Sequence, residues 1–130
     1  MSMTLDELAE QPSPSAAYQL AIDNGQFVYQ RCTPCDRAVF PPRTMCPHCG
    51  GGLRWQQSSG DGTVYSSTAL QHRDSPATNV VLVDLVEGFR MMSTVVGVPA
   101  DEVPLGARLS LTAPGKNDVA WPAFEIVTPA

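Results

Sequence analysis

The sequence predicts a mainly β protein with a short helical N-terminus, a cysteine-bearing ribbon and a C-terminal barrel of five strands. Twelve prolines and ten glycines in 130 residues favour short strands and turns over long helices. Four cysteines form two close pairs between residues 32 and 49. Beyond residue 60, β-prone segments follow one another, separated by turn residues. We therefore divide the chain into a helical segment (1–25), a ribbon (26–59) and a barrel domain (60–130).

Two short helices are expected before the ribbon. Thr4 and Glu7 form a capping-box pattern, which begins a helix. Pro12 and Pro14 are expected to end this helix. We expect Ser15 to cap the second helix, which a glycine then ends. Both helices are too short to be stable alone, so they must pack against the rest of the chain.

The ribbon is expected to begin and end with a strand. Phe27–Tyr29 are β-formers that lead into the first cysteine pair, and Leu53–Gln57 follow the second pair. Between them the chain is rich in proline and turn residues. Ser58–Gly62 is the linker at which we place the boundary to the barrel.

The barrel domain is expected to contain a series of short strands. The candidates are Thr63–Gln71, Asn79–Val86, Phe89–Gly97, Ala107–Thr112 and Trp121–Val127. A Glu-Gly pair makes a hairpin turn between the second and third strands, and a longer connection precedes the fourth. Short strands with glycine at the corners suit a closed or partly open barrel, because closure removes exposed strand edges.

The cysteine spacing predicts a metal site. Cys32 and Cys35 form one C-x2-C pair, and Cys46 and Cys49 form a second pair ten residues later. Two such turns facing each other complete the tetrahedral sulfur shell that Zn²⁺ prefers. His48 lies between two ligands, and we interpret it as a spectator. Four protein ligands leave no position for an activated water, so this zinc is expected to be structural.

The cysteine spacing allows two other interpretations. A redox C-x-x-C is expected once, at a strand–helix junction, rather than twice in proline-rich turns. Iron in a rubredoxin-like site uses the same four ligands, so only metal analysis distinguishes iron from zinc.

The charge pattern sets the ribbon apart from the rest of the chain. Arg31, Arg37, Arg43 and Arg54 fall within the cysteine-bearing segment, where Asp36 is the only acid. Arginine suits the bidentate capture of phosphates and carboxylates, although a genome composition that favours arginine gives the same pattern. The whole chain has a net charge of −5, which argues against a general nucleic-acid binder.

No segment predicts export or membrane insertion. Asp6 and Glu7 lie where a signal peptide needs an apolar core. The longest apolar stretches, near Val80–Val83 and Val95–Val98, are too short to span a bilayer. We expect a cytoplasmic protein, in which cysteines are reduced or metal-bound. The methionine start leans toward a natural small subunit rather than an excised domain.

The sequence offers little catalytic chemistry. His72 is expected in a solvated loop after a strand. Ser66–Thr68 lie within a strand, where side chains alternate between its two faces. Asp84 and Glu87 are expected to be surface charges rather than an acid–base pair.

Taken in order, these segments resemble the acyl-CoA-associated zinc-ribbon/OB-fold family. The resemblance covers about residues 15–127. It is carried by Ala17–Cys32 ending in NGQFVYQRC, by PPRTMCPHCG, GDGTVYSST and VVLVDLVEGFRM, and by PADEVPLGARLSL. The glycine usual after the first cysteine pair is Asp36 here, a residue that tolerates such turn positions.

The resemblance implies a rubredoxin-like ribbon joined to an OB-fold barrel in a non-catalytic accessory subunit. Such subunits form hetero-oligomers with a thiolase-fold enzyme, an aldolase or a hot-dog hydratase, and contribute to binding acyl-CoA while the partner supplies catalysis. In actinobacteria the settings include the breakdown of sterol side chains. Our candidates for contacting the CoA phosphates are Arg43, then Arg37 and Arg31; the alternative is that they offset thiolate charge or face the partner.

Two other classes of function stay open. Zinc ribbons and OB barrels also bind nucleic acids, but the barrel domain contains four basic residues against eight acids. A stand-alone enzyme that uses the barrel loops is the third class. Phe40, Trp55 and Trp121 form either an apolar docking surface or core, and for Trp121 we expect core.

Overall fold

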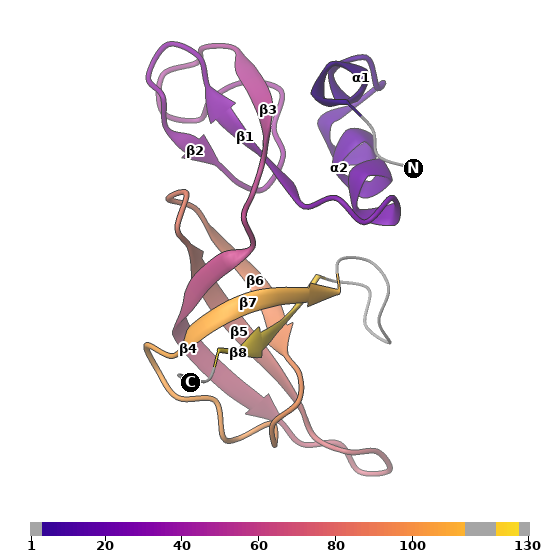
Figure 1. The fold of residues 1–130 in the computed structure, drawn as a ribbon, viewed down its shortest axis with the longest axis vertical. Helices are drawn as coiled ribbons and strands as arrows, with labels where there is room; N and C mark the ends of the chain where they lie inside the picture. The colour runs from indigo at the N-terminus through magenta and orange to yellow at the C-terminus, as the bar shows by residue number, and fades with distance from the viewer. Residues whose placement is uncertain (1–3, 114–121, 128–130) are drawn as a thin grey trace.

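The computed structural model describes residues 4–113 and 122–127. The two helices lie beside a small ribbon, and the barrel lies at the other end of the molecule (Figure 1). The helices are α1 (Leu5–Ala9) and α2 (Pro14–Asp23). The ribbon strands are β1 (Val28–Cys32), β2 (Ala38–Val39) and β3 (Leu53–Gln57), and the barrel strands are β4 (Asp61–Leu70), β5 (Thr78–Leu85), β6 (Arg90–Val95), β7 (Arg108–Ala113) and β8 (Ala123–Ile126).

The first helix begins as predicted, whereas the second begins earlier than predicted. Thr4 and Glu7 form the expected capping box of α1. The cap of α2 is Ser13 rather than Ser15, and Pro14 is its first helical residue instead of a terminator. Proline suits this position because the first amides of a helix have no partner within the helix. Within the described residues, no helix has both the length and the apolar character needed to cross a bilayer.

The two β units have the predicted architecture. The ribbon sheet has the strand order β2-β1-β3, with antiparallel pairing on both sides of β1. The other strands close into a barrel with the order β4-β5-β6-β8-β7, in which β7 returns to pair with β4. The β6–β8 pair is parallel and the other pairs in the barrel are antiparallel. The predicted mainly β fold, with a four-cysteine ribbon and a five-stranded barrel, is confirmed.

Strand boundaries differ from the predicted ones by a few residues. The first ribbon strand runs on to Cys32, three residues beyond the predicted end, and the two-residue strand β2 was not predicted. The last barrel strand begins at Ala123. Trp121 lies outside the described residues, so the expectation that it is a core residue stays a prediction.

The ribbon and the barrel share one apolar core. Phe89, in the turn between β5 and β6, stacks against Tyr29 and Phe40 with ring centroids 4.9 and 5.2 Å apart. Phe27 adds an edge contact to Phe124 of the barrel at 6.3 Å. A second cluster joins the helices to the ribbon sheet, with Trp55 buried in it. Trp55 therefore lies in the core, whereas the half-buried Phe40 packs against the core and keeps part of its surface exposed.

Candidate metal centre

The four cysteine sulfurs converge at one point of the ribbon. Cys32 ends β1, and the other three lie in the turns that follow. All four sulfur atoms lie within 4.8 Å of one another. The Cys32–Cys49 and Cys35–Cys46 sulfur pairs are 3.3 and 3.8 Å apart. A tetrahedral site with Zn–S bonds of about 2.3 Å has sulfur–sulfur edges of about 3.8 Å, so this donor set fits one zinc ion.

Backbone amides and burial set the charge state of the thiols. The amide of Cys35 points at the sulfur of Cys32, and the amide of His48 points at that of Cys46, each with an N–S distance of 3.4 Å. Burial raises the pKa of the Cys32 thiol to about 12. Burial also opposes ionisation of Cys46, but hydrogen bonds from the amides of His48 and Cys49 and from the thiols of Cys32 and Cys35 together lower its pKa to about 7. Binding a cation as four thiolates must therefore release protons.

The two cysteine turns have the same backbone shape. Asp36 follows the first turn with a φ of 61°, and Gly50 follows the second with a φ of 75°. Both angles lie in the left-handed region, where glycine is favoured and aspartate is among the more tolerated alternatives. The prediction that Asp36 can replace the usual glycine is therefore confirmed. Its carboxylate also accepts a hydrogen bond from Arg54 at 2.9 Å.

Gly51 lets the two cysteine turns approach each other. A Cβ at this position would lie 2.5 Å from Cγ of Pro34 and 3.3 Å from the sulfur of Cys49. Any larger residue would push the turns apart. The residues present thus form a closed, all-sulfur site, and zinc held there would cross-link the two turns instead of activating a substrate.

Arg31 is held inside a network of hydrogen bonds. Its Nε donates to the side-chain oxygen of Gln56 at 3.1 Å, and its Nη1 donates to the carbonyl of Asp36 at 2.7 Å. Its Nη2 donates to the hydroxyl of Tyr29 at 3.0 Å and to the carbonyl of Glu87 at 3.2 Å. The last contact crosses from the ribbon to the barrel. These bonds favour a structural role for Arg31 and leave little of its donor capacity for a phosphate.

Arg43 and Arg37 keep exposed side chains. The buried side-chain amide of Gln30 fixes the backbone of Arg43, donating to its carbonyl at 2.9 Å and accepting from its amide at 2.7 Å. Arg43 lines a hollow of about 400 Å³ between the helices and the ribbon. Successive residues of a strand face opposite ways, so the side chains of Gln30 and Arg31 lie on opposite sides of the ribbon sheet. Because Gln30 contacts Arg43, Arg31 and Arg43 lie on different sides, and the three candidate arginines do not form one cluster.

Glu87 has a structural role that the sequence analysis missed. Its carboxylate accepts hydrogen bonds from the hydroxyl of Ser58 at 2.8 Å and from the amide and hydroxyl of Ser59 at 2.8 and 3.0 Å. Burial raises the pKa of Glu87, but these hydrogen bonds outweigh burial and lower it overall. A contact across 28 residues leaves no local sequence signal, so this anchor of the ribbon–barrel linker could not be found from spacing.

The remaining polar candidates are occupied with local contacts. Nε2 of His72 lies 2.8 Å from the hydroxyl of Thr78 in an exposed loop. Asp84 pairs with Arg90 across the β5–β6 hairpin. Among the described residues these groups are not assembled into an acid–base pair.

Two family models match adjoining parts of the chain. Residues 21–54 match the family described as "ChsH2, rubredoxin-like zinc ribbon domain", and residues 55–113 match "ChsH2, C-terminal OB-fold domain". The two matches adjoin, in the order in which the ribbon and barrel occur in the structure. The chain belongs to the ChsH2 zinc-ribbon/OB-fold family.

Two curated relatives are similar to part of this chain. A "Probable enoyl-CoA hydratase alpha subunit" from Thermomonospora curvata is 37% identical over 87 residues, which are 62% of this chain and 27% of that protein. A "DUF35 domain-containing scaffold protein" from Methanothermobacter thermautotrophicus is 28% identical over 88 residues, 62% of this chain and 66% of that protein. This chain thus matches about a quarter of the first relative and just under two thirds of the second.

Two solved structures have the same fold as this ChsH2 family member. One, described as "Ltp2-ChsH2(DUF35) aldolase", has a TM-score of 0.76 and 28% identity, and the match covers 92% of this chain and 98% of the other. The second is a DUF35-family protein of unknown function from Sulfolobus solfataricus, with a TM-score of 0.68 and 14% identity, covering 95% and 93%. At that identity, the second structure supports the fold alone.

Proposed function

We propose that this chain is a non-catalytic accessory subunit of an enzyme complex that acts on CoA thioesters. One observation carries the proposal: nearly the whole chain corresponds to nearly the whole of one chain in the structure described as an aldolase. The relative named as a hydratase alpha subunit points to the same class of substrate. A closed metal site and the lack of an assembled acid–base pair among the described residues are consistent with catalysis by the partner.

The partner is proposed to be an aldolase, a thiolase-fold enzyme or an enoyl-CoA hydratase. The subunit stabilises that complex and helps it to bind acyl-CoA. Among the ribbon arginines, Arg43 and Arg37 are the better placed for the phosphates of CoA, because their side chains are exposed whereas Arg31 is bonded internally. A cytoplasmic complex in the degradation of sterol or other lipid side chains is the setting we propose.

The proposal is tested by isolating and dissecting the complex. The tagged chain is captured from cells that naturally produce it, and partners present in stoichiometric amount are identified by mass spectrometry. We expect an acyl-CoA enzyme that loses activity, solubility or CoA affinity when purified without this chain. A partner that is unrelated to CoA thioesters, or one that is unaffected by the loss, would overturn the proposal.

A substitution separates CoA binding from complex assembly. Arg43→Ala is expected to weaken CoA binding by the assembled complex about three- to tenfold, because a charge-assisted hydrogen bond is lost. Arg73→Ala in the exposed loop after β4 is the matched control. Equal CoA affinity of both variants would remove Arg43 from the proposed site.

Nucleic-acid binding has less support as a function. Single-stranded nucleic acids bind OB barrels through basic grooves and stacking aromatic rings. The apolar cavity in the described barrel is lined by aliphatic and neutral polar residues instead.

A further inference from the structure

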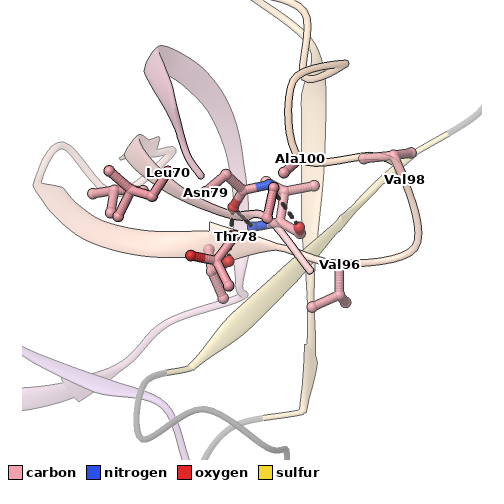
Figure 2. A pocket seen from close by; sticks show the side chains of 10 residues that line it. Leu70, Thr78, Asn79, Val96, Val98 and Ala100 are labelled. Carbon is pink, nitrogen blue, oxygen red and sulfur yellow. Dashed lines mark hydrogen bonds between the residues drawn. The ribbon is translucent and has the colours of Figure 1, made fainter. Parts of the chain in front are cut away.

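The barrel contains an apolar cavity of about 520 Å³. It lies where the end of β4, the start of β5 and the end of β6 meet the connection after β6. Figure 2 shows Leu70 on one side and Val98 on the other, with Asn79 and Ala100 between them in this view. The remaining wall is mostly aliphatic, and no charged residue is among those that line the cavity.

The polar groups in the wall are already bonded to the protein. Nδ2 of Asn79 donates to the carbonyl of Val95 at 3.0 Å, and its Oδ1 accepts from the hydroxyl of Thr94 at 2.7 Å and from the amide of Val95 at 2.9 Å. The hydroxyl of Thr78 is bonded to His72. The polar side chains of the wall are thus engaged within the protein, and the aliphatic side chains around them offer apolar contact.

The cavity lies where OB-fold barrels take their ligands. That position is the face of the second and third barrel strands with the loops between the first two and the last two strands, and the cavity shares the strand face and the first of these loops. In this chain those strands are β5 and β6, and the loop follows Leu70. Ligand pockets typically have volumes of about 300–1,000 Å³, and this cavity falls within that range.

We propose that this cavity binds the uncharged hydrocarbon part of a small molecule, such as a branched or cyclic alkyl group. Leu70 and Val96 at its rim are 42% and 39% exposed, so burying them against a ligand removes apolar surface from water. The open side leaves the polar remainder of the ligand in solvent. The absence of charge from the lining distinguishes this ligand from the polyanions that OB barrels bind elsewhere. This inference does not depend on the accessory function proposed above.

The test is a titration of the zinc-loaded chain with 1-adamantanol, a neutral and bulky hydrocarbon probe. Methyl resonances of the valines and leucine that line the cavity are followed by ¹H–¹³C NMR. We expect saturable shifts confined to these methyl groups, and no such shifts with free CoA, which lacks a large hydrocarbon group.

Ala100→Trp, which fills the cavity, is expected to raise the dissociation constant for 1-adamantanol about tenfold or more. Leu105→Trp, in the same connection and 72% exposed, is the matched control and should leave it unchanged.

Three results would overturn the proposal. The first is the absence of saturable shifts with the probe, and the second is equal binding by the Ala100→Trp and Leu105→Trp variants. The third is unresponsive cavity methyls together with loss of a copurifying protein specifically in Ala100→Trp, which would make the cavity a protein-docking pocket. Because the probe titration needs no partner, its failure would leave the accessory function standing, and failure of the complex isolation would leave the cavity standing.

Discussion

Asp36 in the ribbon and Glu87 in the β5–β6 turn of the barrel each combine two tasks that the sequence displays only in part. Asp36 occupies a left-handed backbone position and also pairs with Arg54. Glu87 accepts hydrogen bonds through its carboxylate from the linker and through its carbonyl from Arg31. The backbone position of Asp36 is a local feature, whereas its pairing with Arg54 and both sets of Glu87 hydrogen bonds depend on the tertiary fold.

Asp36 tests the backbone requirement of the first cysteine turn. Asp36→Val is expected to reduce the free energy of unfolding of the zinc-loaded protein by about 1–2 kcal/mol, because a β-branched residue is strained at positive φ. Asp36→Gly is expected to be close to neutral, since relief of strain offsets a surface ion pair worth about 0–1 kcal/mol. Urea denaturation of both variants checks this. Equal stability of the valine and glycine variants would show that the φ of 61° imposes no constraint.

Glu87 gives a prediction for the pH dependence of stability. Its pKa is lowered in the folded protein from an ordinary value of 4.5, so its contribution is fully present above that value. The contribution is lost as the pH falls through the lowered folded pKa. Glu87→Gln should therefore cost about 0.5–1 kcal/mol at pH 7, a modest amount because solvent screens this partly exposed group.

The matching measurement is urea unfolding of both proteins from pH 7 to pH 3. The difference in unfolding free energy should shrink below about pH 4.5, because protonated glutamic acid and glutamine are then similar. Zinc content is measured at each pH, and only values for zinc-loaded protein are compared, because the contact of Glu87 with the linker needs a folded ribbon. A difference that stays constant to pH 3 would contradict a lowered pKa.

At the scale of elements, the sequence predicted what depends on local pattern. The capping box of α1, the cysteine turns and the five barrel strands follow from spacing and β-propensity. The cap of α2 was misplaced because Pro14 fits both the end of one helix and the first turn of the next. The two-residue strand β2 has no periodicity to detect, and it forms because β1 offers it a pairing edge. The bonds of Arg31 and Glu87 join distant segments, so local pattern could not reveal them.

The ribbon itself is expected to depend on its metal. Removal of zinc with a chelator should unfold the β2-β1-β3 sheet. Metal binding stabilises only the folded ribbon, and four clustered thiols without a cation supply little packing to replace it. Cys46→Ser should have the same effect, whereas His48→Ala should retain the metal because only its backbone contacts the site. Metal analysis and amide NMR spectra check both. Ribbon amide signals that keep their dispersion without metal would contradict a structural zinc.

At the scale of the whole molecule, the ribbon acts as a cover for one end of the barrel. Phe27 and Tyr29 of the ribbon lie in the same buried cluster as Phe89 and Phe124 of the barrel, with ring contacts between them. The linker alone would allow the two units to reorient, but this cluster and the Arg31–Glu87 contact fix them together. We therefore expect the zinc site and the barrel to unfold as one cooperative unit.

Phe89 tests that cooperativity, because its ring is stacked between Tyr29 and Phe40 at the junction. Phe89→Ala is expected to cost about 3–5 kcal/mol and to uncouple the two units. Val83→Ala, a substitution inside the barrel, is the control and should cost about 2 kcal/mol without uncoupling them. Urea titrations of zinc-loaded protein, followed through individual amide NMR signals, distinguish the two effects. Ribbon and barrel signals should share one midpoint in the wild type and in Val83→Ala, and should separate in Phe89→Ala. A single common midpoint in Phe89→Ala would mean that the units are coupled through the Arg31–Glu87 contact rather than through the shared core.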